Sequence, residues 1–323
     1  MKKFTQITQN PFPYTDSNKR YYTYDYYLRR YFGGKCAKIP IDAGFTCPNI
    51  DGRCGTGGCI YCSGRGSGDF ALAATVPVAE QYRRKREELS SKWNTDRCIP
   101  YFQAHTNTYA PVDVLKEKIE SVVRLSGVVG LNIATRADCL EDGVVEYLSE
   151  LAGRLPLTVE LGLQTVHDST ARLINRGHTY EDFLAGFDKL RRASDRINIC
   201  VHLIFGLPNE TDEMMMKSVR QVAELHPEQV KIHLLHVIKG TVMEKMYLSG
   251  DYTPLEKEQY VRLVADAIEL LPPDIVIARL TGDGMSDTLV APDWSRKKVS
   301  VINDIDKLLY ERGSYQGKQR GLA

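Results

Sequence analysis

The sequence predicts an α/β protein built as a partial or complete (β/α) barrel of about six parallel strands. Two observations support this prediction. Short apolar runs alternate with helix-period segments along most of the chain, and polar residues follow almost every run. Alternation of this kind indicates βαβ units around a parallel sheet. A doubly wound open sheet is the alternative, and the lack of a break in composition favours one barrel over two domains.

Seven apolar runs are the candidate strands, at residues 37–45, 99–104, 129–134, 157–163, 197–205, 229–237 and 275–280. Helix-period segments lie between them, at residues 78–92, 112–125, 142–153, 180–193, 210–225 and 255–270. Three of these helices have a favoured starting residue, namely Pro111, Asp142 and Thr211.

Length and composition are those of an ordinary globular chain, with 323 residues, 43% hydrophobic residues and a net charge of +1. No segment has the ~20 apolar residues of a membrane span, and the basic N-terminus lacks the apolar core of a signal peptide. We therefore expect a cytoplasmic protein with no membrane partner. We divide it into a Tyr-rich N-terminal extension packed on the barrel (1–34), the barrel (35–280) and a C-terminal extension (281–323). The polar tail after Tyr310 is expected to fray.

Four of the eight cysteines fall in one Gly-rich loop after the first strand: Cys47, Cys54, Cys59 and Cys62. A reducing compartment disfavours disulfides and favours a metal or catalytic role. A zinc site would use four ligands in two CxxC-like pairs, whereas only one such pair is present. A [4Fe-4S] cluster held by three cysteines would instead leave one iron open to a substrate or cofactor. The loop glycines that would let it fold back are Gly52, Gly55, Gly57 and Gly58.

Polar residues stand where most of the predicted strands end. Active sites of β/α barrels lie at the carboxyl ends of the strands, so these residues are the candidate site. They are Cys47, the run from His105 to Thr108, Arg136 and Asp138, Gln164 and Thr165, the run from Gly206 to Glu210, and Lys239. The aromatic Tyr61, next to Cys62, would suit a cofactor with a flat ring beside the cluster, or would simply pack in the core.

The cysteine loop, which ends in Cys-x-aromatic-Cys, resembles that of the radical S-adenosylmethionine (radical SAM) superfamily. More closely, the chain resembles a bacterial family related to the catalytic subunit of the Elongator complex. The matching motifs cover essentially the whole chain: Asn10-Pro-Phe-Pro-Tyr14, Phe45-Thr-Cys-Pro-Asn-Ile-Asp-Gly52, Gly57-Gly-Cys-Ile-Tyr-Cys62, Gly66-Ser-Gly-Asp-Phe70, Tyr101-Phe-Gln-Ala-His-Thr-Asn-Thr108, Ile133-Ala-Thr-Arg-Ala-Asp-Cys139, Val159-Glu-Leu-Gly-Leu-Gln-Thr165, Gly206-Leu-Pro208, Lys231-Ile-His-Leu-Leu-His236, Lys239-Gly-Thr241 and Thr281-Gly-Asp-Gly284.

The resemblance implies that Cys47, Cys59 and Cys62 hold a [4Fe-4S] cluster. Cys54 lies outside the family pattern, as a bystander or as a ligand in an alternative state. Two departures affect the SAM contacts. Ala137 stands where relatives often have proline, and Asn209-Glu210-Thr211 replaces a Gly-Glu-Thr motif. The acetyl-transfer domain of the Elongator subunit has no counterpart in the sequence, so we do not expect that subunit's full reaction.

The family's chemistry implies that SAM chelates the open iron. One electron, from a donor such as a flavodoxin or ferredoxin, then releases a 5′-deoxyadenosyl radical. Arg136 would meet the SAM carboxylate bidentately. The expected SAM contacts at other strand ends and in the barrel are Tyr61, Gln103, Thr106, Asn107, Glu160 and Gln164. Glu160 is alternatively a buried structural carboxylate paired with arginine, and His202 and His233 are expected to be hydrogen-bonded core histidines.

Gram-positive members of this branch resemble an enzyme that modifies tRNA. It removes the carboxymethyl group from 5-carboxymethylaminomethyl(-2-thio)uridine at the wobble position and leaves the aminomethyl form. The resemblance therefore implies tRNA as a partner. Candidate cations for the substituent's carboxylate are Lys35, Lys231 and Lys239. A basic rim from Arg83–Arg86 and Arg296–Lys298 would neutralise phosphates, and an N-terminal tyrosine or Trp294 would stack on the base.

Two other classes of function stay open at this stage. One is a radical SAM enzyme that acts on a small molecule or a protein, which would need the same barrel and cluster. The other is a non-enzymatic zinc-binding module, which the four clustered cysteines would equally permit.

Overall fold

The computed structural model describes residues 10–282 and 287–320, so Asp283 and Gly284 of the last motif lie outside the described residues. Its main sheet contains seven strands in the described part of the chain, and each overlaps one of the seven candidate strands. They are β1 (Ala37–Ile41), β2 (Cys98–Phe102), β3 (Leu131–Thr135), β4 (Leu157–Gln164), β5 (Ile197–Phe205), β6 (Gln229–Leu234) and β8 (Val276–Arg279).

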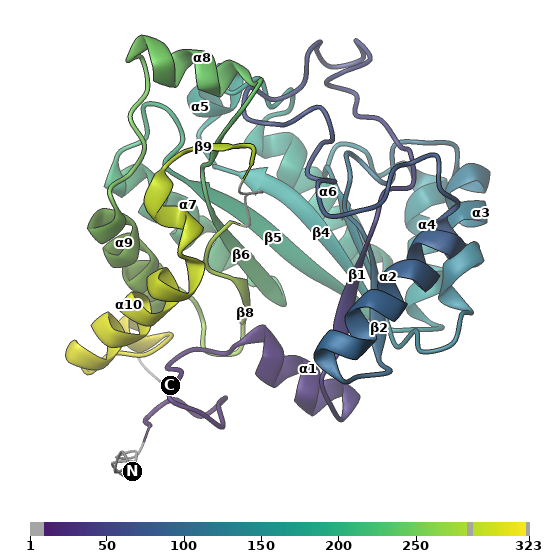
Figure 1. Cartoon of the computed structure of the whole chain (residues 1–323), viewed down its shortest axis with the longest axis horizontal. Helices are drawn as coiled ribbons and strands as arrows, with labels where there is room; N and C mark the ends of the chain where they lie inside the picture. The colour runs from purple at the N-terminus through teal and green to yellow at the C-terminus, as the bar shows by residue number, and fades with distance from the viewer. Residues whose placement is uncertain (1–9, 283–286, 321–323) are drawn as a thin grey trace.

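All neighbouring strands of this sheet are parallel, and their spatial order follows the chain. A doubly wound sheet would instead reverse its strand order at a switch point. The sheet curls into a half-barrel, which confirms the predicted partial (β/α) barrel of radical SAM type (Figure 1).

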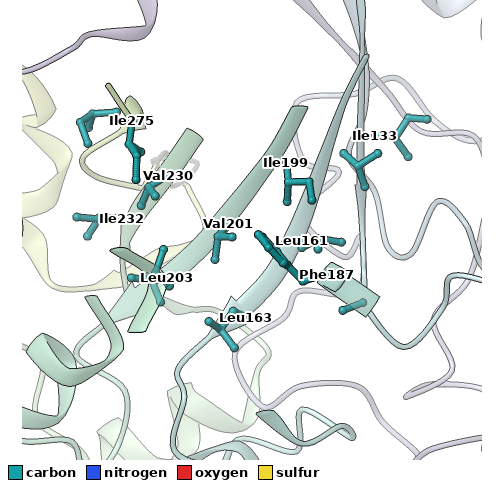
Figure 2. Close-up of a cluster of buried hydrophobic side chains, with 14 of the residues drawn as sticks. Ile133, Leu161, Leu163, Phe187, Ile199, Val201, Leu203, Val230, Ile232 and Ile275 are labelled. Atoms are coloured by element: carbon teal, nitrogen blue, oxygen red, sulfur yellow. The ribbon is translucent and has the colours of Figure 1, made fainter. Parts of the chain in front are cut away.

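The convex face of the sheet is apolar and fully buried. On β4, Leu161 and Leu163 point to this face, and Ile199 and Val201 do so on β5 (Figure 2). Period-two alternation places these side chains opposite the polar residues of the same strands. The face is covered by amphipathic helices, namely α2 (Val78–Trp93), α3 (Val112–Val123), α4 (Asp142–Ala152), α6 (Tyr180–Ala193), α7 (Asp212–Leu225) and α9 (Lys257–Leu270).

Several elements escaped the sequence prediction. They are α1 (Tyr24–Phe32), α5 (Asp168–Leu173), α8 (Val242–Ser249), α10 (Lys298–Glu311), the two-stranded sheet of β7 (Val237–Ile238) and β9 (Leu289–Ala291), and the short 3-10 helices η1 (Asp293–Arg296) and η2 (Lys318–Arg320). Figure 1 shows α5 and α8 at the carboxyl edge of the sheet and α1 at the opposite edge. The half-barrel is therefore covered differently at its two ends.

The N-terminal segment closes the amino end of the half-barrel. Thr23 bridges to Ile277 of β8 in parallel, and the carbonyl of Tyr22 accepts from the amide of Ile277 at 2.8 Å. Tyr24 packs with Cys36 and Ile99 near the starts of β1 and β2. Helix α1, which contains Tyr24, therefore lies beneath the concave side of the sheet at its amino end.

The prediction that the tail frays is wrong for residues 311–320. Gln316 is fully buried, and its Nε2 donates to the carbonyl oxygens of Pro272 (2.6 Å) and Ile275 (2.7 Å). Its Oε1 accepts from the amide of Tyr22 at 2.8 Å. One buried amide thus ties the tail to the N-terminal segment and to the start of β8, because buried polar atoms need partners.

Among the described residues, no helix combines the length and apolar character that a membrane crossing requires.

Candidate active site

The cysteine loop, residues 47–62, follows β1 and lies at the carboxyl edge of the sheet (Figure 1). The amide of Ile60 donates to the carbonyl of Ile174 just after α5, and the amide of Met243 in α8 donates to the carbonyl of Ile60, both at 3.1 Å. Ile60 and Tyr61 also pack against a small apolar cluster that includes Ile174 and Met243. The loop is therefore anchored where barrel active sites lie.

Two asparagines fix the path of this loop. Asn175 Nδ2 donates to the carbonyl oxygens of Thr56 (3.1 Å) and Gly58 (2.7 Å). Asn49 is fully buried, donates to the carbonyl of Asn175 and lies 3.7 Å from Cys59 Sγ. An amide N–H aimed at a thiolate sulfur is a common support of iron–sulfur ligands.

The loop glycines behave largely as the sequence predicts. Gly52, Gly57 and Gly58 have φ of 96°, 78° and 76°, a region that other residues rarely adopt. Gly55 is needed for space, because a Cβ there would lie 2.5 Å from Asn49 Oδ1 and would clash with that side chain.

The three expected ligand cysteines are partly accessible and free, and their chemistry suits metal thiolates. A hydrogen bond from Cys62 lowers the pKa of Cys59 to about 7, while the same bond and burial raise the pKa of Cys62. Thiolates are the form that binds metal.

Cys54 differs from the other three in its surroundings. It is exposed, and its Sγ lies 3.9 Å from Asp138 Oδ2. Burial and the Asp138 charge raise the pKa of its thiol, which disfavours a thiolate. The bystander role stays a prediction, and these surroundings support it.

Arg136 is buried and already has partners. Its Nε and Nη2 donate to Asp138 at 2.9 and 2.7 Å, and its Nη1 donates to the carbonyl of Arg176 at 2.6 Å. The bidentate contact with a SAM carboxylate stays a prediction, and it would require the guanidinium to leave or share Asp138.

The residues expected to contact SAM from the end of β2 lie together but bond mainly to backbone. Gln103 Nε2 donates to the carbonyl of Ser67 at 2.8 Å. Asn107 Nδ2 donates to the carbonyls of Phe102 (3.2 Å) and Ala134 (2.8 Å), which joins β2 to β3, and its Oδ1 has no partner among the described residues. Thr106 is buried beside it. Their SAM contacts also stay predictions.

Gln164 is held in an unusual backbone conformation at the end of β4. Its φ is 64°, and the register with β5 shifts between Gly162 and Gln164. The buried Arg176 donates to the carbonyls of the two flanking residues, Leu163 and Thr165 (2.6 Å for Thr165). Such strain persists where surrounding contacts enforce it, and it clusters at functional sites.

The side chain of Gln164 points toward the cysteine loop. It hydrogen-bonds with Tyr61, whose hydroxyl also bonds to Cys59. Gln164 Oε1 is buried without a partner among the described residues. An unpaired buried acceptor beside the cysteines is what a ligand-binding position would leave free.

The concave face of the sheet carries a polar layer centred on Glu160. Glu160 Oε1 accepts from Lys38 Nζ (2.9 Å) and Asn132 Nδ2 (2.7 Å). Its Oε2 accepts from the Tyr101 hydroxyl (2.7 Å), His202 Nε2 (2.8 Å) and Lys231 Nζ. Because both oxygens are taken, the geometry fits the structural carboxylate that the sequence left open, with lysines in place of arginine. The SAM contact of Glu160 stays an untested prediction.

His202 bonds to Glu160, as expected of a core histidine, whereas His233 is less satisfied. The two rings lie 5.2 Å apart, and His233 Nε2 is buried without a partner among the described residues. Burial and the Lys231 charge lower the pKa of His202 to about 4. His202 is therefore a neutral imidazole that donates its hydrogen bond to Glu160.

The ligand atoms of Glu160, Cys200 and His202 lie within 4.8 Å of one another. They do not form a plausible metal centre, because two lysine ammonium groups already flank the carboxylate. A cation there would be repelled by both.

Sequence reasoning missed Lys38, Tyr101 and Asn132 as members of this layer. The signal was available, since period-two alternation on each strand assigns them to the same face as Glu160. It missed Arg176 for a different reason. This residue lies in the loop after α5, where no periodicity indicates what a side chain contacts.

His178 provides a pH-dependent prediction. It is 8% exposed, and neither ring nitrogen has a hydrogen-bond partner among the described residues. Burial and the charges of Arg176 and Arg136 lower its pKa to about 3. Because the unfolded chain, with a pKa of about 6.5, takes up this proton first, stability is lost as pH falls from 6.5 toward 3.

His178→Phe should therefore flatten the acid limb of the stability profile. As the pH falls from 6 to 4, the free energy of unfolding of this variant should rise relative to that of the wild type by about 1.4 kcal/mol per pH unit. Urea unfolding at several pH values measures this. Parallel profiles for the two proteins would show that His178 does not titrate as stated.

Two family models match the sequence. Residues 49–222 match the model described as the Radical SAM superfamily, and residues 227–311 match the Radical_SAM C-terminal domain. Together they cover the half-barrel from β2 onward and the helices as far as α10, whereas β1 lies before the matched residues.

Among similar proteins, the uncharacterized protein YtqA of Bacillus subtilis is 50% identical over 312 residues, which are 97% of this chain and 96% of YtqA. A tRNA uridine(34) acetyltransferase of Methanocaldococcus jannaschii is 31% identical over 159 residues, which are 48% of this chain and 28% of that protein. The second relationship thus covers only a part of each chain.

A solved structure of Elp3 from the archaeon Methanocaldococcus infernus, with an N-terminal deletion, superposes with a TM-score of 0.65. The match covers 87% of this chain and 64% of that chain at 19% identity. At this identity the likeness shows a shared fold.

Proposed function

We propose that this chain, which belongs to the radical SAM superfamily and uses a [4Fe-4S] cluster with S-adenosylmethionine, modifies the wobble uridine of tRNA. In this proposal it removes the carboxymethyl group from 5-carboxymethylaminomethyl-(2-thio)uridine and leaves 5-aminomethyl-(2-thio)uridine. The non-enzymatic zinc module is not retained, because the family consists of enzymes that carry this cluster.

One observation carries the choice of substrate. About half of the chain is 31% identical to a protein named for acetyl transfer to uridine 34 of tRNA. The shared segment supports our proposal of a similar kind of substrate, whereas acetyl transfer is the activity named for the longer protein.

The residues at the carboxyl edge have defined tasks in this proposal. Cys47, Cys59 and Cys62 would hold the cluster, and Asn49 and Asn175 orient their loop. When bound, the cluster supplies the electron that cleaves S-adenosylmethionine to a 5′-deoxyadenosyl radical. Gln164, held by its strained backbone beside Tyr61, would offer its free amide oxygen to the cofactor.

Three lysines were candidates for the substituent's carboxylate, and their positions differ. Lys35 precedes β1, at the edge away from the cysteines, and its Nζ lies 5.0 Å from the ring centroid of Trp93. Lys239 is exposed after β7. Lys231 alone of the three lies in the concave polar layer, so we retain it.

The tRNA-facing surface is less defined. Arg83 and Arg84 both pair with Glu80, and Lys85 pairs with Glu88, so much of that charge is balanced on the helix itself. Trp294 is not available for base stacking, because it packs on the main core and donates from Nε1 to the carbonyl of Leu255 at 3.1 Å. The exposed N-terminal Tyr31 lies on α1, at the edge away from the cysteines, so it is no better placed to stack on the base.

The experiment is mass spectrometry of wobble nucleosides in tRNA from a strain that lacks this gene. We expect the carboxymethylaminomethyl nucleoside to accumulate and the aminomethyl nucleoside to disappear, and complementation to reverse both changes. Purified, anaerobically reconstituted protein should make the same conversion on that tRNA, given a flavodoxin or ferredoxin as reductant. Unchanged nucleosides would refute the tRNA substrate and point to a small-molecule or protein substrate.

A further inference from the structure

We infer that Lys38 and Lys231, aligned by Glu160, form an anion subsite on the concave face of the half-barrel. This subsite would bind the carboxylate of the substrate's wobble substituent. The inference rests on the proposed function for the identity of that carboxylate. The subsite itself is argued from donors, charge and position.

The first observation is a surplus of hydrogen-bond donors. An ammonium group has three N–H donors. Among the described residues, Lys38 Nζ donates to Glu160 Oε1, while Lys231 Nζ donates to Glu160 Oε2 and to the Tyr101 hydroxyl at 3.3 Å. Each lysine thus retains at least one donor without a protein acceptor in the described part of the chain, whereas both oxygens of Glu160 are fully used.

The second observation is an imbalance of charge. Among the described residues, these two ammonium groups share one carboxylate, and only 4% of the Lys231 side chain and 25% of the Lys38 side chain are exposed. Burial, with help from the charge of Lys38, lowers the pKa of Lys231 to about 8 despite Glu160. The Arg279 charge acts in the same direction. An unbalanced buried cation is costly, and an anionic ligand would relieve that cost.

The ammonium groups are also held in place from the side. Lys38 Nζ lies 4.0 Å, and Lys231 Nζ 4.8 Å, from the ring centroid of Tyr101. A cation over an aromatic face is stabilised there, so one ring positions both. Placement before the ligand arrives reduces the entropy lost on binding.

The position of the subsite along the strands suits a substrate that enters from the carboxyl edge, where the cysteines lie. In the sheet register, Lys231 pairs with His202, and His202 pairs with Gly162. Gln164 is two residues further along β4, a rise of about 7 Å. A Cβ at Gly162 would lie 2.9 Å from Gln164 Nε2, so the Gln164 side chain covers this glycine and would have to turn aside for a ligand to reach the lysines.

The unpaired nitrogen of His233 belongs to the same wall. Its ring stays neutral because burial and the charges around it lower its pKa. Neutral His233 can donate one further hydrogen bond, which an anion in this position would accept.

The test compares ligands with and without the carboxylate. The probes are the nucleosides 5-carboxymethylaminomethyluridine and 5-aminomethyluridine, titrated into anaerobically reconstituted enzyme with S-adenosylmethionine present. We expect the wild type to prefer the carboxylated nucleoside, and Lys231→Met and Lys38→Met each to reduce that preference about 10- to 100-fold. Lys231→Arg, which keeps the charge, should recover part of it. With tRNA, the same variants should raise KM more than they lower kcat.

The matched control is Lys245→Met, an exposed lysine on α8, which should keep the wild-type preference. Circular dichroism and iron content show whether each variant folds and holds its cluster. Should Lys231→Met not fold, the more accessible Lys38 supports the same comparison. A wild type that leaves the modified tRNA unchanged overturns the proposed function. A wild type that converts it, with lysine variants of unchanged preference, overturns the subsite alone.

Discussion

Replacing any one of Cys47, Cys59 or Cys62 by alanine should reduce the cleavage of S-adenosylmethionine to background. Each variant should also lose most of the roughly four irons per chain that a [4Fe-4S] cluster brings. The reason is coordination. Asn49 and Asn175 fix the path of the loop that carries the three cysteines, and the loss of one thiolate would leave a second iron of the cluster without a protein ligand. Iron and sulfide analysis after anaerobic reconstitution, with chromatography of 5′-deoxyadenosine, measures both effects.

Cys54→Ala is the matched control from the same loop. Its sulfur is exposed, faces Asp138 and has a raised thiol pKa, so its removal should leave iron content and cleavage close to wild type. An equal loss in Cys54→Ala would mean that all four cysteines are ligands. A colourless wild type that carries zinc would contradict the cluster assignment for this loop.

The sequence was sufficient where the determinants are local. The bounds of β5 and α6 were predicted at their observed residues, because β5 is a long apolar run and α6 begins with a complete capping box at Thr179 and Asp182. The first strand was predicted too long. It ends at Ile41, since the amide of Asp42 bonds to the side chain of Gln81 rather than to a neighbouring strand.

Elements whose stability comes from distant contacts escaped prediction. Tyrosine-rich α1 has weak intrinsic helix propensity, and it is held by an N-cap at Thr23 and by packing under the sheet. The tail is ordered by Gln316, whose partners lie far away in the sequence. No periodicity within either segment reports these contacts.

The candidate site divides in the same way. The cysteine spacing is a local motif, and the rule that barrel sites lie at strand ends points to Gln103, Arg136 and Gln164. The partners of Glu160 come from five different strands, and which lysine reaches which oxygen depends on how the sheet curls. Alternation predicts the face that these residues occupy but not their pairing.

Glu160→Ala should destabilise the protein by about 3–5 kcal/mol, because it leaves two buried ammonium groups without their counter-charge. Although burial opposes ionisation, the charges of Lys231 and Lys38 hold the pKa of Glu160 well below its ordinary value. The stabilisation is therefore fully present above pH 4.5 and is lost as pH falls through the lower folded-state pKa. Urea unfolding followed by circular dichroism at pH 7 measures the cost.

The surface carboxylate Glu120 gives the comparison. It accepts hydrogen bonds from Arg154 and Tyr147 but is partly exposed, so Glu120→Gln should cost about 0–1 kcal/mol. If the two substitutions cost the same, the Glu160 layer would contribute no more than an ordinary surface pair.

A double variant separates charge from packing at Glu160. Glu160→Gln keeps the shape and some hydrogen bonds but leaves the cations unbalanced, and adding Lys231→Met removes one of them. If unbalanced charge is the main cost of Glu160→Gln, the double variant should be more stable than Glu160→Gln alone. Two destabilising substitutions with additive effects would instead make the double variant less stable. Additive losses would instead assign the cost to lost hydrogen bonds and packing. The same result tests the anion subsite. A carboxylate ligand can stabilise the polar layer around Glu160 only if the surplus positive charge of that layer is costly.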